Sequence, residues 1–237
     1  MTGPVGRSVP HRSIDLNADL GEEVTDDAAL LEVVTSANVA CGYHAGTAAI
    51  MREVCERAVL RGVSVGAQVS YADRPNFGRV PVEVPYDILR EQVAHQVGVL
   101  SEIARIAGTE VRYLKPHGAL YHRVLDDEEQ AAAVLAGSGQ LPLLGMPGVL
   151  LDHGFASGRT VMHEGFPDRG YDADGRLLAR DRPGALLHDS AQIARRAVEL
   201  AGTVASVCVH GDSTGAVATA RACRTALEGA GFRLAGL

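Results

Sequence analysis

The chain of 237 residues is 46% hydrophobic, which suits one large α/β domain, or two small ones, with a full core. Only 4% of the residues are aromatic and tryptophan is absent, so we expect an aliphatic core of Ala, Val and Leu. The formal net charge of −7 argues against nucleic acid or an anionic membrane as the main partner, although local arginines could still bind a small anion.

The four cysteines, Cys41, Cys55, Cys208 and Cys223, form no C-x-x-C pair and no zinc-module spacing. This pattern predicts reduced thiols in a cytoplasmic protein. Residues 1–12 are predicted to be a flexible tail, without the apolar segment of a signal peptide. The uncharged stretch 130–151 is broken by six glycines and prolines, so it predicts a helix, a loop, a buried strand and a turn instead of a membrane span.

Beyond the tail, short strands alternate with helices along the chain. Alternating or small apolar residues predict seven strands, at about 13–19, 38–41, 63–68, 111–115, 141–145, 160–164 and 205–210. Helices are predicted at about 26–34, 47–61, 85–108, from 126, at 190–200 and from 215 to 228, with long loops at 69–84 and 165–189. Residues 13–237 are therefore predicted to form a single α/β domain of parallel strand–helix units. Seven units favour a closed (β/α)7 barrel, with an open doubly wound sheet as the alternative.

Polar side chains gather where the predicted strands end. The carboxyl ends of parallel strands meet at one mouth of a barrel, so residues remote in sequence should converge there on one pocket. The candidates are Asp15, Asn17, Asp19 and Glu22 on the first strand, Asn38 and His44 on the second, Gln68 on the third, Lys115 and His117 on the fourth, Glu164, Asp168 and Arg169 on the sixth, and His210 and Asp212 on the seventh.

Lys115 is the only lysine among 22 basic residues, the rest being arginine. Arginine is a planar, permanently charged fork, whereas lysine is a point cation whose pKa can fall on burial. We therefore expect Lys115 to stabilise an oxyanion or a phosphoryl oxygen, with a pKa that burial could lower.

The other candidates suit proton transfer or substrate binding. Asp19 is the first choice for orienting water, and His44, His117 and His210 could shuttle protons near neutral pH. These four residues and Lys115 are the predicted catalytic set. The predicted substrate-binding set is Asp15, Asn17, Glu22, Asn38, Gln68, Glu164, Asp168, Arg169 and Asp212.

A metal site is a competing hypothesis. Asp15 or Asp19 with two of the three histidines could ligate Zn, Mn or Fe, but no H-E-x-x-H or H-x-x-x-H pair links these residues, so a bound metal is not favoured. The chain also has no G-x-x-x-x-G-K-[ST] loop, no complete dinucleotide fingerprint and no G-x-S-x-G motif. Any nucleotide would have to bind in an unfamiliar way or on a partner.

Five blocks resemble the lactam-utilisation (LamB/YcsF) family, which includes the A-subunit of bacterial 5-oxoprolinase. They are IDLNADLGE (14–22), SANVACGYHAG (36–46), KPHGALY (115–121), EGFPDRGY (164–171) and CVHGD (208–212). The resemblance implies a seven-stranded barrel related to polysaccharide deacetylases. It also implies ATP-dependent opening of 5-oxo-L-proline (pyroglutamate) to L-glutamate with partner subunits B and C, ATP being a co-substrate with Mg.

Two departures from the family pattern affect the expected chemistry. Gln68 stands where many members have a histidine, which weakens a metal site, and Ala18 replaces the usual cysteine, which argues against a thiol nucleophile there. Phosphorylating the lactam oxygen would make the unreactive amide electrophilic, and water would then open the ring. Two alternatives stay open: a metal-dependent deacetylase or amidohydrolase acting alone, and a non-catalytic member that only binds its partners.

Overall fold

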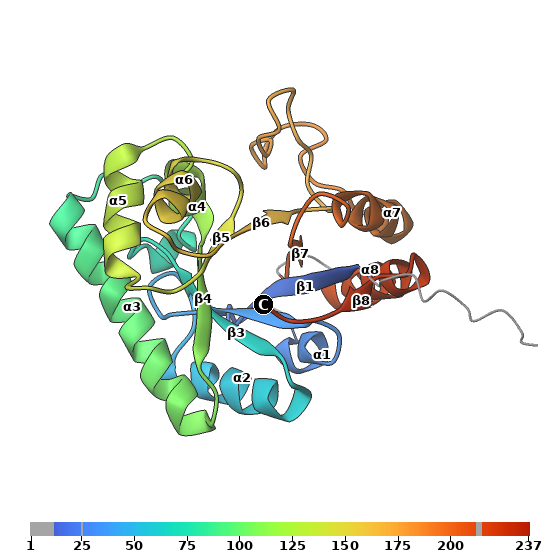
Figure 1. Ribbon diagram of the computed structural model, residues 1–237, viewed down its shortest axis with the longest axis horizontal. Helices are drawn as coiled ribbons and strands as arrows, with labels where there is room; N and C mark the ends of the chain where they lie inside the picture. The colour runs from blue at the N-terminus through green and yellow to red at the C-terminus, as the bar shows by residue number, and fades with distance from the viewer. Residues whose placement is uncertain (1–11, 25, 212–214) are drawn as a thin grey trace, which may run out of the picture.

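The computed structural model describes residues 12–24, 26–211 and 215–237, and its strands form a closed parallel barrel. The strands are β1 (Ser13–Leu20), β2 (Ser36–Ala40), β3 (Ser64–Val69), β4 (Val111–Pro116), β5 (Leu143–Gly145), β6 (Val161–Gly165) and β7 (Ser206–Val209). They pair in chain order, and β1 pairs with both β2 and β7 (Figure 1). The predicted closed seven-stranded barrel is confirmed.

Helices surround this barrel on its outside (Figure 1). They are α1 (Asp27–Leu31), α2 (Ala48–Arg61), α3 (Tyr86–Ala107), α4 (Gly118–Arg123), α5 (Glu128–Gly137), α6 (Val149–Ala156), α7 (Ser190–Leu200) and α8 (Ala216–Gly229), with a 3-10 turn at Arg74–Asn76. Local sequence sets several ends. The Thr47 hydroxyl caps the first turn of α2, and Gly62 ends it with φ of 65°.

Four elements differ from the predictions. Helix α4 replaces the loop expected after Lys115: His117 is its extended N-cap, and Gly118, with φ of +62°, begins the helix. Helix α6 and the two-residue strand β8 (Arg233–Leu234) were not predicted from the sequence. Helix α1 ends at Leu31, three residues short of the expected end at Val34.

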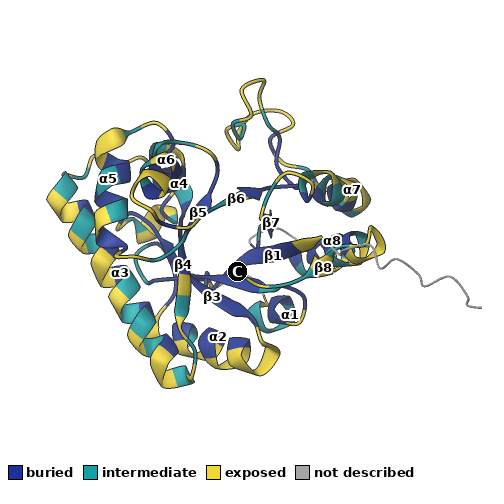
Figure 2. Cartoon of the chain, in the orientation of Figure 1, coloured by how far each residue is buried: buried dark blue, intermediate teal, exposed yellow. Residues whose placement is uncertain are grey.

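The hydrophobic core lies between the barrel and the helices (Figure 2). Outward-facing strand residues such as Leu16, Val65 and Leu114 are buried beneath α2, α3 and the other helices, which contribute residues such as Val54 and Leu100. The aliphatic character expected from composition is confirmed in this layer.

The inside of the barrel is polar, unlike the branched aliphatic filling typical of such barrels. The Tyr113 hydroxyl donates to Asn38 Oδ1 at 2.6 Å, and its ring lies over Gly66, where an added Cβ would overlap it. Polar side chains therefore lie along the barrel interior as far as its carboxyl-terminal mouth, where they could form a site.

The C-terminal segment covers the opposite, amino-terminal end of the barrel. Strand β8 pairs with Ser13 and Ile14 of β1. Beyond it, Leu237 N donates to Ser36 Oγ at 3.1 Å, and Ser64 Oγ donates to the Leu237 oxygen at 2.7 Å. The chain thus ends inside the ring of strands in Figure 1.

Two long loops border the mouth. The loop between β6 and α7 projects away from the barrel in Figure 1 and is held by bridges between Arg169 and Leu186 and between Tyr171 and Leu177.

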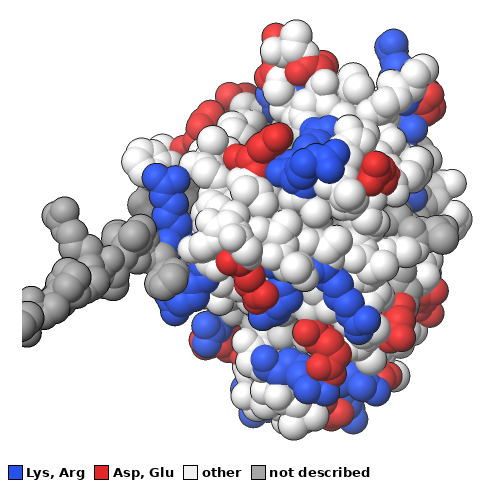
Figure 3. All heavy atoms as spheres, turned by 90° about the vertical axis from the view of Figure 1, so that its right-hand side faces the viewer, with Lys and Arg blue, Asp and Glu red and all other residues white. Residues whose placement is uncertain are grey.

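On the face bearing α7 and α8, the described acidic and basic side chains are intermixed (Figure 3). No helix within the described residues is long and apolar enough to cross a membrane. The predicted tail, apart from Arg12, lies outside the described residues.

Candidate active site

A cavity of about 490 Å³ opens at the carboxyl-terminal mouth of the barrel. Six of the predicted site residues line it: Asp19, Glu22, Lys115, His117, Arg169 and His210. They come from four strands and the loops that follow them. Barrel closure thus brings Asp19 and His210 to one cavity, although they are 191 positions apart in the sequence.

Lys115 lies at the floor of this cavity and is only 2% exposed. Its Nζ is 3.0 Å from Glu164 Oε2 and 3.2 Å from Asp19 Oδ1, and it donates to Cys208 Sγ at 3.1 Å. Burial alone would lower the pKa of Lys115, but the negative charges around it, Asp19 foremost, raise the pKa well above its ordinary value. The expectation of a lowered pKa was wrong, so Lys115 is a permanent cation here and not a nucleophilic amine.

Asp19 is the ionised partner of that cation. Burial would raise its pKa, but the positive charge of Lys115, the strongest opposing influence, holds the pKa below its ordinary value. Its Oδ1 also accepts a hydrogen bond from Asn38 Nδ2 at 2.8 Å. Asp19 therefore stays a carboxylate at neutral pH, which suits it to orient a water molecule in the cavity.

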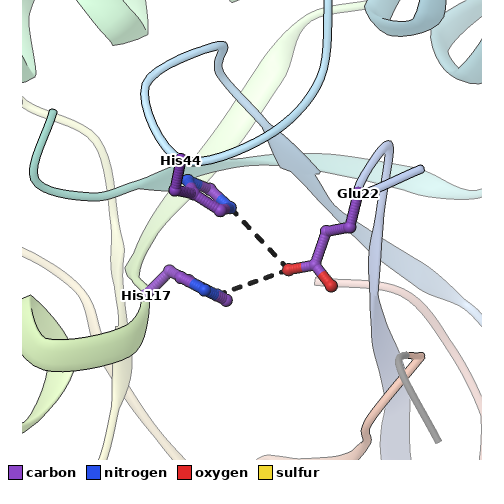
Figure 4. A group of neighbouring side chains, drawn as sticks. All are labelled: Glu22, His44 and His117. Atoms are coloured by element: carbon purple, nitrogen blue, oxygen red, sulfur yellow. Dashed lines mark ion pairs between the residues drawn. The ribbon is translucent and has the colours of Figure 1, made fainter. Parts of the chain in front are cut away.

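Glu22, His44 and His117 form a cluster beside this pair, and both imidazoles point towards the Glu22 carboxylate (Figure 4). Glu22 Oε1 is 3.3 Å from His117 Nδ1 and 3.7 Å from His44 Nε2. One ligand atom from each residue lies within 4.8 Å of the others, so the cluster has the residue types and spacing of a metal site. The carboxylate in this cluster is Glu22, whereas the sequence hypothesis named Asp15 or Asp19: Asp15 lies deep in the barrel, and Asp19, 4.0 Å from His117 Nδ1, pairs with Lys115.

The state of His117 is set by its surroundings. Burial, the largest influence on it, lowers its pKa well below the ordinary value, so the ring is neutral. Its Nε2 lies 3.1 Å from the Phe77 carbonyl oxygen, which can only accept, so the proton sits on Nε2 and Nδ1 carries a lone pair. Phe77 has φ of 57°, rare for a bulky residue, and nothing in the sequence predicted its role.

His210 forms a second acid–imidazole pair across the cavity. Its Nδ1 lies 2.9 Å from Asp168 Oδ2, and its backbone N–H donates to the same oxygen at 3.2 Å. Burial would raise the pKa of Asp168, but the charge and hydrogen bonds of His210 hold the pKa below its ordinary value. The carboxylate therefore orients the imidazole ring, which lines the cavity.

Arginines border the cavity above these groups. Arg79, Arg169 and Arg180 line it, and the Arg79 guanidinium lies 4.7 Å from the centre of the Phe77 ring. Arg169 also donates to the carbonyl oxygens of Ala185 at 3.1 Å and Leu178 at 2.6 Å, which anchors the β6–α7 loop. The mouth is thus basic and the floor acidic.

The remaining predicted residues lie away from the cavity surface and support those that line it. Asn17 joins Ser206 to Asn38, and Asp15 accepts hydrogen bonds from the hydroxyls of Thr35, Ser36 and Ser206. Each of the other buried residues contacts at least one residue that lines the cavity. The pairs include Asn38 with Asp19, His44 with Glu22, Gln68 with His117, Glu164 with Lys115, and Asp168 with His210. Asp212 lies outside the described residues.

Several residues at the cavity were not predicted. Cys208 and Ser206 alternate with His210 along the seventh strand, so strand periodicity could have placed them on the inner face. Tyr121 and Phe166 sit inside the quoted motifs, and the Phe166 ring stacks on His210 at 5.3 Å between centroids. Arg79 and Arg180 come from long loops, where no local pattern signals a role.

Known proteins resemble this chain over nearly its whole length. A protein from Streptomyces avermitilis, named as the A-subunit of 5-oxoprolinase, is 50% identical over 94% of this chain and 98% of its own length. The crystal structure of a lactam utilization protein from Thermus thermophilus superposes with a TM-score of 0.88 at 32% identity, covering 95% of this chain and all of that one.

More distant structures share the fold. A peptidoglycan deacetylase from Bacillus subtilis, PdaC, superposes with a TM-score of 0.55 at 12% identity over 96% of this chain and 89% of that one. The predicted relation to the deacetylase fold is confirmed at this level. The sequence model of the LamB/YcsF family matches residues 14–237, so the chain belongs to the LamB/YcsF family.

Proposed function

We propose that this protein is the A-subunit of 5-oxoprolinase, a hydrolase that opens 5-oxo-L-proline to L-glutamate at the expense of ATP and works with partner subunits B and C. The relative at 50% identity carries that subunit's name, which supports a multi-subunit enzyme. The four free, buried cysteines are typical of a cytoplasmic protein.

The single observation that carries the proposal is the Lys115–Asp19 ion pair at the floor of a cavity with a basic border. The carboxylate of 5-oxoproline would face Arg79 and Arg180, and its lactam group would face Lys115 and Asp19. Fixed charges in a water-poor site act more strongly than in bulk water, so Lys115 can stabilise negative charge that develops on the lactam oxygen.

The ring-opening step follows from these states. Transfer of the γ-phosphoryl group of ATP, with Mg, to the lactam oxygen releases ADP and leaves the ring carbon electrophilic. Asp19 orients water towards that carbon, a neutral imidazole such as His117 takes the proton, and Lys115 stabilises the charge on the substituent oxygen. The ring C–N bond then breaks, His210 is placed to protonate the departing nitrogen, and the product is the γ-acyl phosphate of L-glutamate. A second water molecule hydrolyses that acyl phosphate to L-glutamate and inorganic phosphate.

The test is glutamate release from 5-oxoproline and ATP by the complex reconstituted with subunits B and C. Lys115→Arg should lower turnover by about 10²-fold or more, because a bulky fork cannot occupy the point-charge site. Arg112→Lys is the matched control, since Arg112 is an exposed cation on the same strand and should keep full activity. Circular dichroism and thermal unfolding would verify the fold, and near-normal turnover of Lys115→Arg would remove the central claim.

A second candidate function is metal-dependent deacetylation or amide hydrolysis by the isolated chain. The Glu22–His44–His117 cluster and the fold shared with PdaC favour it. Hydrolysis of an N-acetyl sugar by the chain alone, lost on treatment with a chelator and restored by Zn²⁺ or Mn²⁺, would support this candidate over the first.

A further inference from the structure

Gln68 occupies the centre of the Glu22–His44–His117 cluster. The side chain projects from β3, is 0% exposed and contacts both imidazoles, whose rings stack on each other with centroids 4.0 Å apart. Its Nε2 donates to Glu22 Oε1 at 2.9 Å and lies 2.9 Å from His117 Nδ1, and its Oε1 lies 3.3 Å from His44 Nε2. One amide thus contacts all three residues that would otherwise ligate a metal.

Each of these contacts pairs a donor with an acceptor. The two amide hydrogens meet a carboxylate oxygen and the lone pair of His117 Nδ1, whose ring carries its proton on Nε2 towards the Phe77 carbonyl. The amide oxygen requires a hydrogen on His44 Nε2. A metal ligand must instead offer a free lone pair, so an ion would have to displace the amide from Glu22 and His117 and remove the proton from His44 Nε2.

We propose that Gln68 is a positioning residue that takes the place of a metal ion, cross-linking Glu22, His44 and His117 and setting the tautomers of both imidazoles. His117 then keeps its Nε2–H on the Phe77 carbonyl and its Nδ1 lone pair on the Gln68 amide, and His44 carries its proton on Nε2. The proposal concerns the same cavity as the proposed function, but its tests use no substrate, so either proposal can fail without the other.

Metal binding is the first test. Zn²⁺ alone is titrated calorimetrically into the purified wild-type chain, Gln68→His and Gln68→Met. Gln68→His adds a ligand and should bind Zn²⁺ at least about tenfold more tightly than wild type, with the gain lost in Gln68→His combined with His44→Ala. Gln68→Met keeps the side-chain length but frees the three ligand atoms. Its Zn²⁺ affinity should lie between that of wild type and that of Gln68→His.

Gln96→Met is the matched control for losing a buried glutamine amide. Gln96 is also fully buried, but its amide bonds the backbone of Ser70, away from the cluster. This variant should leave Zn²⁺ affinity unchanged. Stoichiometric, tight Zn²⁺ binding by wild type that is lost in His44→Ala would overturn the proposal, as would a folded Gln68→His with no gain in affinity.

The second test reads the tautomers directly, and its decisive measurement is made on the wild-type chain. Imidazole ¹⁵N chemical shifts at pH 7.5 should show His44 and His117 both protonated on Nε2 only. In Gln68→Met the His44 ring should populate both tautomers, while His117 stays fixed by Phe77. If His44 carries its proton on Nδ1 in wild type, the amide is turned the other way and the proposal falls, even if every Gln68 variant fails to fold.

Discussion

Single residues at this site owe their chemistry to partners that are distant in sequence. Lys115 stands out in the sequence as the lone lysine, and its position at a strand end was predicted correctly. Its charge state was not, because the sequence does not reveal that Glu164 and Asp19 flank it at 3.0 and 3.2 Å. Composition marks a candidate, and the contacts determine whether it acts as a cation or as a nucleophile.

Asp15 makes a prediction about stability and pH. Burial raises its pKa from 3.8 to about 6, with the hydrogen bonds from Ser206, Ser36 and Thr35 only partly opposing the shift. Because the folded-state pKa is raised, its contribution to stability is fully present below pH 3.8 and is lost as pH rises through about 6. The loss should total roughly 3 kcal/mol by pH 7.5.

Asp15→Asn should abolish this dependence, because an amide does not titrate. Urea unfolding of both proteins at intervals from pH 4 to pH 7.5 measures the effect, taken as the difference between wild type and variant. The free energy of unfolding of the wild type, minus that of the variant, should therefore fall as pH rises. A difference that stays flat across this range would show that the Asp15 carboxyl is not raised.

At the scale of elements, the turn between β4 and α4 packs against the loop that carries Phe77. Ala119 N donates to the Gly78 oxygen at 2.8 Å, which fastens this turn to the loop that carries Phe77. An added Cβ at Gly118 would overlap that same carbonyl group. The close approach of two backbones therefore places His117 against Phe77, and it requires glycine at position 118.

Gly118→Ala should destabilise the protein more than the same change at Gly139. Both glycines have nearly equal backbone angles, φ of +62° and +61°, but a Cβ at Gly139 would meet nothing within 4 Å. Gly139→Ala therefore measures backbone strain alone, about 1 kcal/mol. Gly118→Ala adds the overlap with Gly78 and should cost about 1–3 kcal/mol more.

Chemical denaturation of the two variants checks this, and glutamate release by the reconstituted complex gives a second reading. Gly118→Ala should also lower turnover, because the His117–Phe77 contact moves, whereas Gly139→Ala should not. Equal losses of stability in the two variants would mean that the turn relaxes freely and does not set the position of His117.

At the scale of the whole molecule, closure of the barrel creates the site and the C-terminal segment seals the other end. Ring closure of β1 with β7 brings His210 and Lys115 to the same cavity as Asp19. At the opposite end, Leu237 bonds Ser36 and Ser64, and Ser36 in turn bonds Asp15. The polar interior is therefore closed at its base by the chain's last residues.

Removing residues 235–237 should open that base to water. The truncated protein loses the Ala235 and Leu237 hydrogen bonds and exposes the Asp15 network, so we expect a loss of about 2–4 kcal/mol in unfolding free energy. Ser64→Ala removes only one of these bonds and should cost about 1 kcal/mol. Thermal and urea unfolding compare the two. A truncation no worse than Ser64→Ala would show that the segment does not seal the barrel.

Much of the architecture could be predicted because strands, helices and caps depend on local residues. Thr47 and Gly62 bound α2 as expected, and α7 was predicted at its observed limits, Ser190–Leu200. Helix α4 was missed because Pro116 and Gly118 favour a loop locally, and only the packing of Gly118 against Gly78 stabilises the turn into a helix. Two residues were too few to reveal β8.

The sequence by itself determined the repeating strand–helix order, the aliphatic outer core and the set of polar strand ends, because periodicity and composition are local properties. Only the tertiary structure decided which of those polar groups meet. It paired Lys115 with Asp19 and Glu164, His210 with Asp168, and Gln68 with both imidazoles. Charge state and tautomer follow from burial and from neighbours within about 3 Å, and those neighbours are 24 to 96 residues apart in the chain.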